Sequence, residues 1–176
     1  NSKSRSAWWL SKCVWAVASV FLYFLLLWGV IALFCLCGGG TLSLGVSKSL
    51  IYKLIPMPVE NVYAFSVEMI VSGKLTLQMF LMPVLIVSAF SILQMTASLW
   101  IKPFFSFCIS AGALVLSAYY LHPAFLGNYA MSQRNSILIQ NGVRLEIGIM
   151  FSAVLLLISC VVGLCAFRRY DILNKE

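Results

Sequence analysis

Four long runs of apolar residues constrain this chain more than any other feature of its sequence. They cover residues 14–37, 75–101, 104–121 and 147–167. A helix needs about 20 predominantly apolar residues to cross ~30 Å of hydrocarbon, and each run is close to that length. Hydrophobic residues make up 62% of the 176 residues and charged residues 10%, which is too apolar for a soluble domain. The sequence therefore predicts an all-α, polytopic membrane helix bundle with four transmembrane helices, forming one transmembrane domain over 1–176.

Basic residues near the ends of the runs predict the topology. Arg5 and Lys12 precede the first run, Lys102 lies in the tightest turn, and Arg168 and Arg169 follow the last run. Lys and Arg are enriched on the cytoplasmic side of membrane spans. We therefore expect a multi-pass protein of the cytoplasmic (inner) membrane with both termini in the cytoplasm. Topology accounts for the net charge of +7, and no basic run is long enough to indicate nucleic-acid binding.

Two segments then lie outside, at 41–74 and 122–146. The first is mixed in polarity, and the second is too polar to span the membrane and too apolar for a free loop. Pro56 and Pro58 interrupt the first segment, which predicts one or two interfacial helices or a short re-entrant element. The second segment predicts a pair of interfacial helices between Pro123 and Gly142.

Small and weakly polar residues form stripes on the predicted helices. Ser88, Ser91, Gln94 and Ser98 follow one another at steps of three, three and four. Such stripes allow close helix packing in membranes, and we favour packing over the lining of a transport pathway. Gln94 differs, because an amide in the membrane needs a partner or water. The remaining stripes are Ser106, Ser110, Ala113 and Ser117 in the third run, and Gly148, Ser152, Ser159 and Gly163 in the last.

The sequence carries no motif for catalysis, metal binding or nucleotide binding. Lys48-Ser49 lacks the glycine spacing of a phosphate-binding loop, and neither HExxH nor GxSxG occurs. The six cysteines form no CxxC pair, and His122 is the single histidine. The four runs contain no acidic residue, which argues against an ion-coupled or proton-coupled carrier. We expect no catalytic residue, no metal site and no bound cofactor, and energy for any uphill transport must come from a partner.

The order of several segments resembles a known family. A basic and aromatic start, Ser4-Arg-Ser-Ala-Trp-Trp-Leu-Ser-Lys12, precedes the first run, and a tight turn at Lys102-Pro103 joins the second to the third. The outer segment Gly127-Asn-Tyr-Ala-Met-Ser-Gln-Arg134 follows, and the last run ends in Phe167-Arg-Arg-Tyr-Asp-Ile-Leu173. This arrangement resembles the C-terminal four helices of the permease subunit of a type-2 exporter-class ABC transporter.

The resemblance implies that the runs are helices three to six of a six-helix permease, so the chain is either a fragment that lacks the first two helices or a shorter relative. Arg5, Trp8, Trp9 and Lys12 would then dock a cytoplasmic ATPase subunit, which holds the ATP and Mg²⁺. Arg168, Arg169 and Asp171 would form the cytoplasmic tail. The expected partners are this ATPase, a second permease copy or homologous permease, and membrane lipid.

Two functions follow from these expectations. The first is ATP-driven export of a hydrophobic or amphipathic substrate, such as a peptide, lipid or drug, with the Gln94 face along its path. The alternative is a non-transporting integral membrane immunity or assembly factor, held together by its helix stripes.

Overall fold

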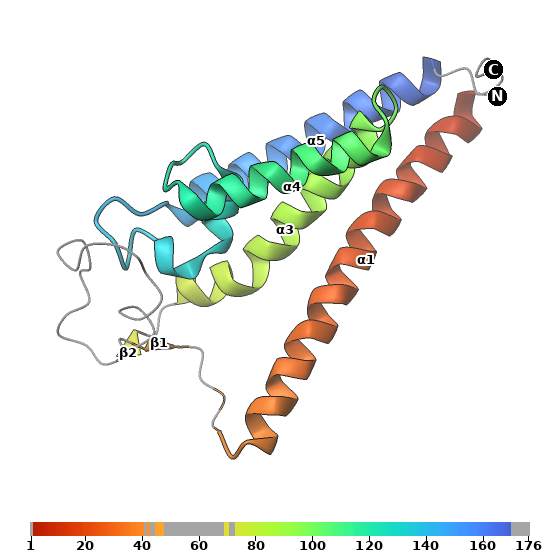
Figure 1. The fold of residues 1–176 in the computed structure, drawn as a ribbon. Coiled ribbons are helices and arrows are strands. Elements are labelled where there is room, and N and C mark those ends of the chain that lie inside the picture. Colours follow the sequence, from red (N-terminus) through yellow and green to blue (C-terminus); the bar gives the residue numbers. More distant parts are fainter. Residues whose placement is uncertain (1, 41, 43–44, 48–68, 71–72, 170–176) are drawn as a thin grey trace.

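The structure is a computed structural model, and it describes residues 1–176 except 1, 41, 43–44, 48–68, 71–72 and 170–176 (Figure 1). Its described part is predominantly helical. The long helices are α1 (Ser2–Cys37), α3 (Gly73–Ala97), α4 (Pro103–Tyr119) and α5 (Leu145–Arg169). Two short 3-10 helices, η2 (Leu126–Ala130) and η3 (Ser132–Arg134), lie between α4 and α5, and β1 (Val46–Ser47) pairs antiparallel with β2 (Met69–Ile70).

Three of the helices are long and apolar enough to cross a membrane. They correspond to Arg5–Cys37, Gly73–Ala97 and Leu145–Arg168, while α4 is a shorter apolar helix of 17 residues. The prediction of a helical, multi-pass membrane bundle is confirmed at this level. The fourth predicted span, 104–121, forms a helix about 25 Å long at about 1.5 Å per residue, slightly less than the ~30 Å core.

The helix ends follow from local sequence. Pro103 lies in the first turn of α4, where its missing N–H is not needed. The α1 helix ends at a glycine triplet, in which Gly39 adopts a φ of +70° that only glycine reaches without strain. The N–H groups of Gly38 and Gly40 bond the carbonyls of Phe34 and Cys35 at 3.0 and 2.9 Å, so the helix terminus is satisfied.

The helices alternate in direction between two ends of the bundle. Figure 1 shows the start of α1, the end of α5 and the α3–α4 turn at one end, which we call the terminal end. The end of α1, the start of α3 and the connection 120–144 lie at the other, which we call the loop end. This is the alternation that four successive spans require.

The predicted small-residue stripes of α4 and α5 are packing surfaces. Ser106, Ser110 and Ser117 are buried on α4, and the Ser106 hydroxyl donates to the carbonyl of Gln94 on α3 at 2.9 Å. On α5, Ser152 and Ser159 are buried, and the Ser159 carbonyl accepts from Thr96 Oγ1 at 2.8 Å. Small residues thus let α3 approach both α4 and α5 closely.

The prediction for the outer segment 122–146 is wrong in detail. In place of two interfacial helices between Pro123 and Gly142, the chain forms η2, η3 and a bridge between Asn135 and Val143. Polar side chains here bond to nearby backbone and compete with helix formation. For 41–74, β1 and β2 are described, while the predicted helices fall largely on residues outside the described part.

Candidate functional site

The start of α1 is fixed to the end of α5 by Trp9. Its side chain is 1% exposed, and its indole N–H donates to the carbonyl of Cys160 at 3.2 Å. The ring also stacks on Phe167, with centroids 5.6 Å apart. Gly163 makes room for it, because a Cβ there would lie 2.1 Å from Trp9 Cζ2. The packing of Trp9 on α5 therefore needs glycine at 163.

The first turns of α1 also carry an exposed, basic face next to the Trp9 side. Arg5, Trp8, Lys12 and Trp15 follow at steps of three, four and three, so they share one helix face. Trp8 is 51% exposed and stacks on Phe167 at 4.9 Å, and Lys12 Nζ lies 5.3 Å from the centre of the Trp8 ring. An exposed face of cations and aromatic rings suits lipid headgroups or a protein partner.

The residues expected to dock a partner differ in their exposure. Arg5, Trp8 and Lys12 lie on the exposed face, whereas Trp9 faces α5 and cannot touch a partner in this conformation. Docking by Arg5, Trp8, Trp9 and Lys12 stays a prediction, and Trp9 is the one of the four that is buried. Neighbouring residues of a helix point about 100° apart, so the Trp8-Trp9 pair cannot lie on one surface.

The predicted tail is described in part. Arg168 is exposed, and its Nε donates to Ser6 Oγ at 2.8 Å, a second contact between the first and last helices. The side chain of Arg169 and all of Asp171 lie outside the described residues.

The predicted stripe on α3, which consists of Ser88, Ser91, Gln94 and Ser98, divides between two environments. Ser91, Gln94 and Ser98 line a pocket of about 250 Å³ with Met95 and Pro103, beside the α3–α4 turn. Ser88 is instead buried, and its hydroxyl has no hydrogen-bond partner within the described residues. The pocket therefore contains three of the four predicted residues.

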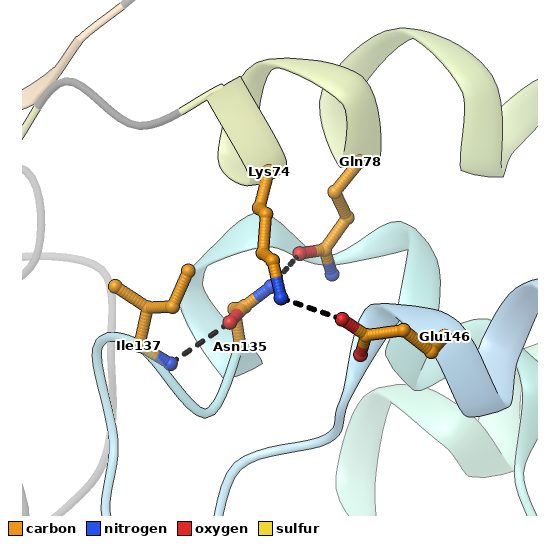
Figure 2. Close-up of polar contacts among 5 residues, drawn as sticks. All are labelled: Lys74, Gln78, Asn135, Ile137 and Glu146. Carbon is orange, nitrogen blue, oxygen red and sulfur yellow. Dashed lines mark hydrogen bonds and ion pairs between the residues drawn. The ribbon is translucent and has the colours of Figure 1, made fainter.

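Gln78, which the sequence analysis did not single out, anchors the loop-end segment to α3. Its side chain is fully buried, and its amide donates to the carbonyls of Tyr129 at 2.8 Å and Met131 at 3.3 Å. The amide of Asn135 donates in turn to the Gln78 side-chain oxygen, and Asn135 Oδ1 accepts from the Ile137 N–H at 2.8 Å (Figure 2). Every polar atom of this pair thus has a partner, as burial in a membrane protein requires.

An ion pair lies next to this network. Lys74 Nζ approaches Glu146 Oε1 at 2.6 Å and links the first turns of α3 and α5 (Figure 2). Both side chains are exposed, so its contribution to stability is small.

Arg134 closes the C-terminal end of α4. Its guanidinium donates to the carbonyls of Ser117 and Ala118, both at 2.6 Å, and to the side-chain oxygen of Asn128. The last carbonyls of a helix lack intrahelical partners and carry negative partial charge, which a cation there stabilises. Burial lowers the pKa of Arg134, but a guanidinium remains charged in proteins.

Tyr129 fills the space between this segment and α5. It is fully buried, and its hydroxyl donates to the carbonyl of Pro123 at 2.9 Å. Burial raises the pKa of its phenol, which keeps it neutral and able to donate. Gly148 lies against the ring, where a Cβ would approach Tyr129 Cδ1 to 2.5 Å.

These contacts define what the two ends can do. At the loop end, the side chains of Gln78, Arg134 and Asn135 are occupied by structural hydrogen bonds. The terminal end presents an exposed basic and aromatic face and a small polar pocket. In the described part of the chain, no three His, Cys, Asp or Glu side chains gather to hold a metal ion. Compared with known protein families, curated proteins and solved structures, the chain matches none.

Proposed function

We propose that this chain is the membrane-spanning subunit of an ATP-driven exporter, with energy supplied by a separate cytoplasmic ATPase subunit. The proposal rests on one observation: Trp9 attaches the first turns of α1 to α5, while Arg5, Trp8 and Lys12 lie exposed on the adjacent face. The terminal end would face the cytoplasm, because its described charged side chains, Arg5, Lys12, Lys102 and Arg168, are all basic.

The packing supports a route for force. Trp8 and Trp9 both stack on Phe167, and Trp9 and Cys13 belong to one apolar cluster with Ile92 of α3. A displacement applied to the start of α1 would therefore be transmitted to α5 and α3 together. A packed cluster deforms little, so it moves as a unit.

The polar pocket at Gln94 is where we propose that the substrate binds. It opens beside the α3–α4 turn, at the end where an exporter loads. Its volume of about 250 Å³ accommodates a small polar group, while the surrounding apolar surface accommodates hydrocarbon. We therefore propose a hydrophobic or amphipathic substrate whose polar part contacts Gln94.

The test is co-purification and ATPase coupling with a candidate cytoplasmic ATPase subunit. An Arg5→Glu, Trp8→Ala double variant should lose the complex. The matched control, Arg144→Glu with Tyr119→Ala, makes the same kinds of change in exposed residues near the loop end and should retain it. Equal behaviour of the two variants would reject docking on this face. Absence of any ATPase complex in the unmodified protein would favour a non-transporting membrane factor.

A further inference from the structure

An apolar hollow lies between α1, α3 and α5 on the half of the bundle nearer the terminal end. Its volume is about 520 Å³, within the range of ligand-binding pockets. Its lining includes Leu10, Val17 and Phe21 of α1, Val84 of α3, and Leu156 and Cys160 of α5. Every lining residue is apolar or a cysteine, so the hollow suits hydrocarbon rather than a polar ligand.

The length of the hollow matches one leaflet of a bilayer. Leu10 and Phe21 mark its extent along α1, about 16 Å at about 1.5 Å per residue. The hydrocarbon core is ~30 Å thick, so the hollow is about as deep as one layer of acyl chains. Farther along α1, the rings of Trp28 and Phe80 meet edge to face at 4.9 Å and join α1 to α3.

A cationic group stands at the terminal mouth of the hollow. Ser6 precedes Leu10 by four residues, so it continues the lining face of α1 by one turn, and Arg168 lies about two turns beyond Cys160 on α5. Arg168 Nε donates to Ser6 Oγ at 2.8 Å. Two helices therefore place this hydrogen bond at the same mouth, where phospholipid headgroups would lie.

The positive charge at the terminal end favours binding of an anionic headgroup. Arg5, Lys12, Lys102 and Arg168 are the described charged side chains here, and all are basic. A guanidinium offers several donors in a planar arrangement that fits phosphate oxygens. Arg168 uses its Nε toward Ser6, and its side chain is exposed.

We propose that this hollow binds one anionic phospholipid, with an acyl chain between α1, α3 and α5 and the phosphate on Arg168. The site lies on the opposite face of α1 from Trp8 and Lys12. It does not depend on the proposed exporter function, because a non-transporting membrane protein could bind the same lipid.

The headgroup contact can be tested on the full chain in bilayers with spin-labelled phosphatidylglycerol and phosphatidylcholine. The unmodified protein should immobilise phosphatidylglycerol preferentially. Arg168→Gln should reduce that preference about fivefold, the effect of about one surface cation on lipid association. Arg168→Lys should retain most of it, and Lys102→Gln, which removes a cation elsewhere at this end, should change it less than twofold. An equal loss in Arg168→Gln and Lys102→Gln would overturn the site.

The acyl-chain contact needs a separate test. Ala18→Phe fills the hollow with a ring, whereas Val115→Phe makes a similar change on the exposed surface of α4. Ala18→Phe should displace one immobilised lipid and Val115→Phe should displace none. In a variant retaining Cys160 as its one cysteine, phosphatidylglycerol should slow alkylation of this lining thiol more than phosphatidylcholine does. Unchanged lipid binding in Ala18→Phe, or equal alkylation rates in the two lipids, would reject the site.

Discussion

The side-chain amide of Asn135 donates a hydrogen bond to the side-chain oxygen of Gln78, and both residues are buried at the loop end of the bundle. These residues are 57 positions apart in sequence. Through this bond and the Gln78 amide, α3 holds the 3-10 segment against the bundle. Amides that satisfy each other in an apolar setting are costly to separate, because each then loses its partner.

Replacing Gln78 with leucine should destabilise the fold. The change leaves the Asn135 amide and the Tyr129 and Met131 carbonyls without the Gln78 partner, and each unsatisfied buried group costs about 1–3 kcal/mol. We expect a lower melting temperature in detergent micelles and faster proteolysis within 122–145. Gln94→Leu is the control on the same helix, where the side chain lies at a half-exposed pocket. Equal destabilisation by the two changes would contradict the role of Gln78.

Arg134 should not be replaceable by lysine. Its guanidinium reaches the carbonyls of Ser117 and Ala118 through two different nitrogens, a geometry that one ammonium group cannot reproduce. Arg134→Lys and Arg134→Gln should each cost about 1–3 kcal/mol of folding free energy. Thermal unfolding measures both, and a lysine variant as stable as the original would refute this account.

The Arg134 contact should also be insensitive to pH between about 6 and 9. Burial lowers its pKa, so the folded state would release the proton at a lower pH than the unfolded state does. A guanidinium nevertheless stays protonated throughout this range. The stability difference between the original protein and Arg134→Gln should therefore be constant across it, and a difference that shrinks by pH 9 would show deprotonation.

Gly163→Ala should weaken the junction of α1, α3 and α5. The added Cβ would lie 2.1 Å from Trp9 Cζ2 and 2.7 Å from Thr96 Oγ1, and overpacking typically costs about 1–3 kcal/mol. Gly112→Ala is the matched control, because nothing lies within 4 Å of a Cβ in the middle of α4. That change should be neutral or stabilise by about 0.5–1 kcal/mol. Similar melting temperatures for the two variants would argue against this packing.

A cross-link should report the attachment of α1 to α5. The Sγ atoms of Cys13 and Cys160 lie 3.8 Å apart, so mild oxidation should join them with little movement. Mass spectrometry should find two fewer alkylatable thiols and a peptide pair containing both cysteines. Trp9→Ala should lower the yield, whereas the exposed Trp8→Ala should change it little. Preferential cross-linking of Cys13 to Cys165 would place α5 differently.

Periodicity made the helices and their packing stripes predictable. Apolar runs gave all four long helices to within a few residues, except that α1 begins at Ser2, ahead of its apolar run. The serines of α4 and the small residues of α5 were correctly placed on buried faces because small side chains at helical spacing have few other uses in a membrane. Gly163 was predicted as a packing residue without its partner, Trp9.

The loop-end segment could not be predicted, because its stability comes from distant side chains. Gln78 is polar in an apolar run just as Gln94 is, and no local feature of the sequence distinguishes it as a buried anchor. Its partners, Tyr129 and Asn135, are more than fifty residues away, beyond any local pattern. Trp8 and Trp9 posed a similar difficulty, since adjacent identical residues differ only in the direction of their side chains.

The length of α1 has a consequence for how the protein responds to its bilayer. Its apolar run, 14–37, is about 36 Å long at about 1.5 Å per residue, compared with a hydrocarbon core of ~30 Å. Such a hydrophobic mismatch is relieved by tilting or by locally thickening the membrane. The angle between α1 and the rest of the bundle therefore depends on membrane thickness. The Trp9 junction at one end would act as the pivot of that tilt, so the composition of the surrounding bilayer sets the shape of the protein.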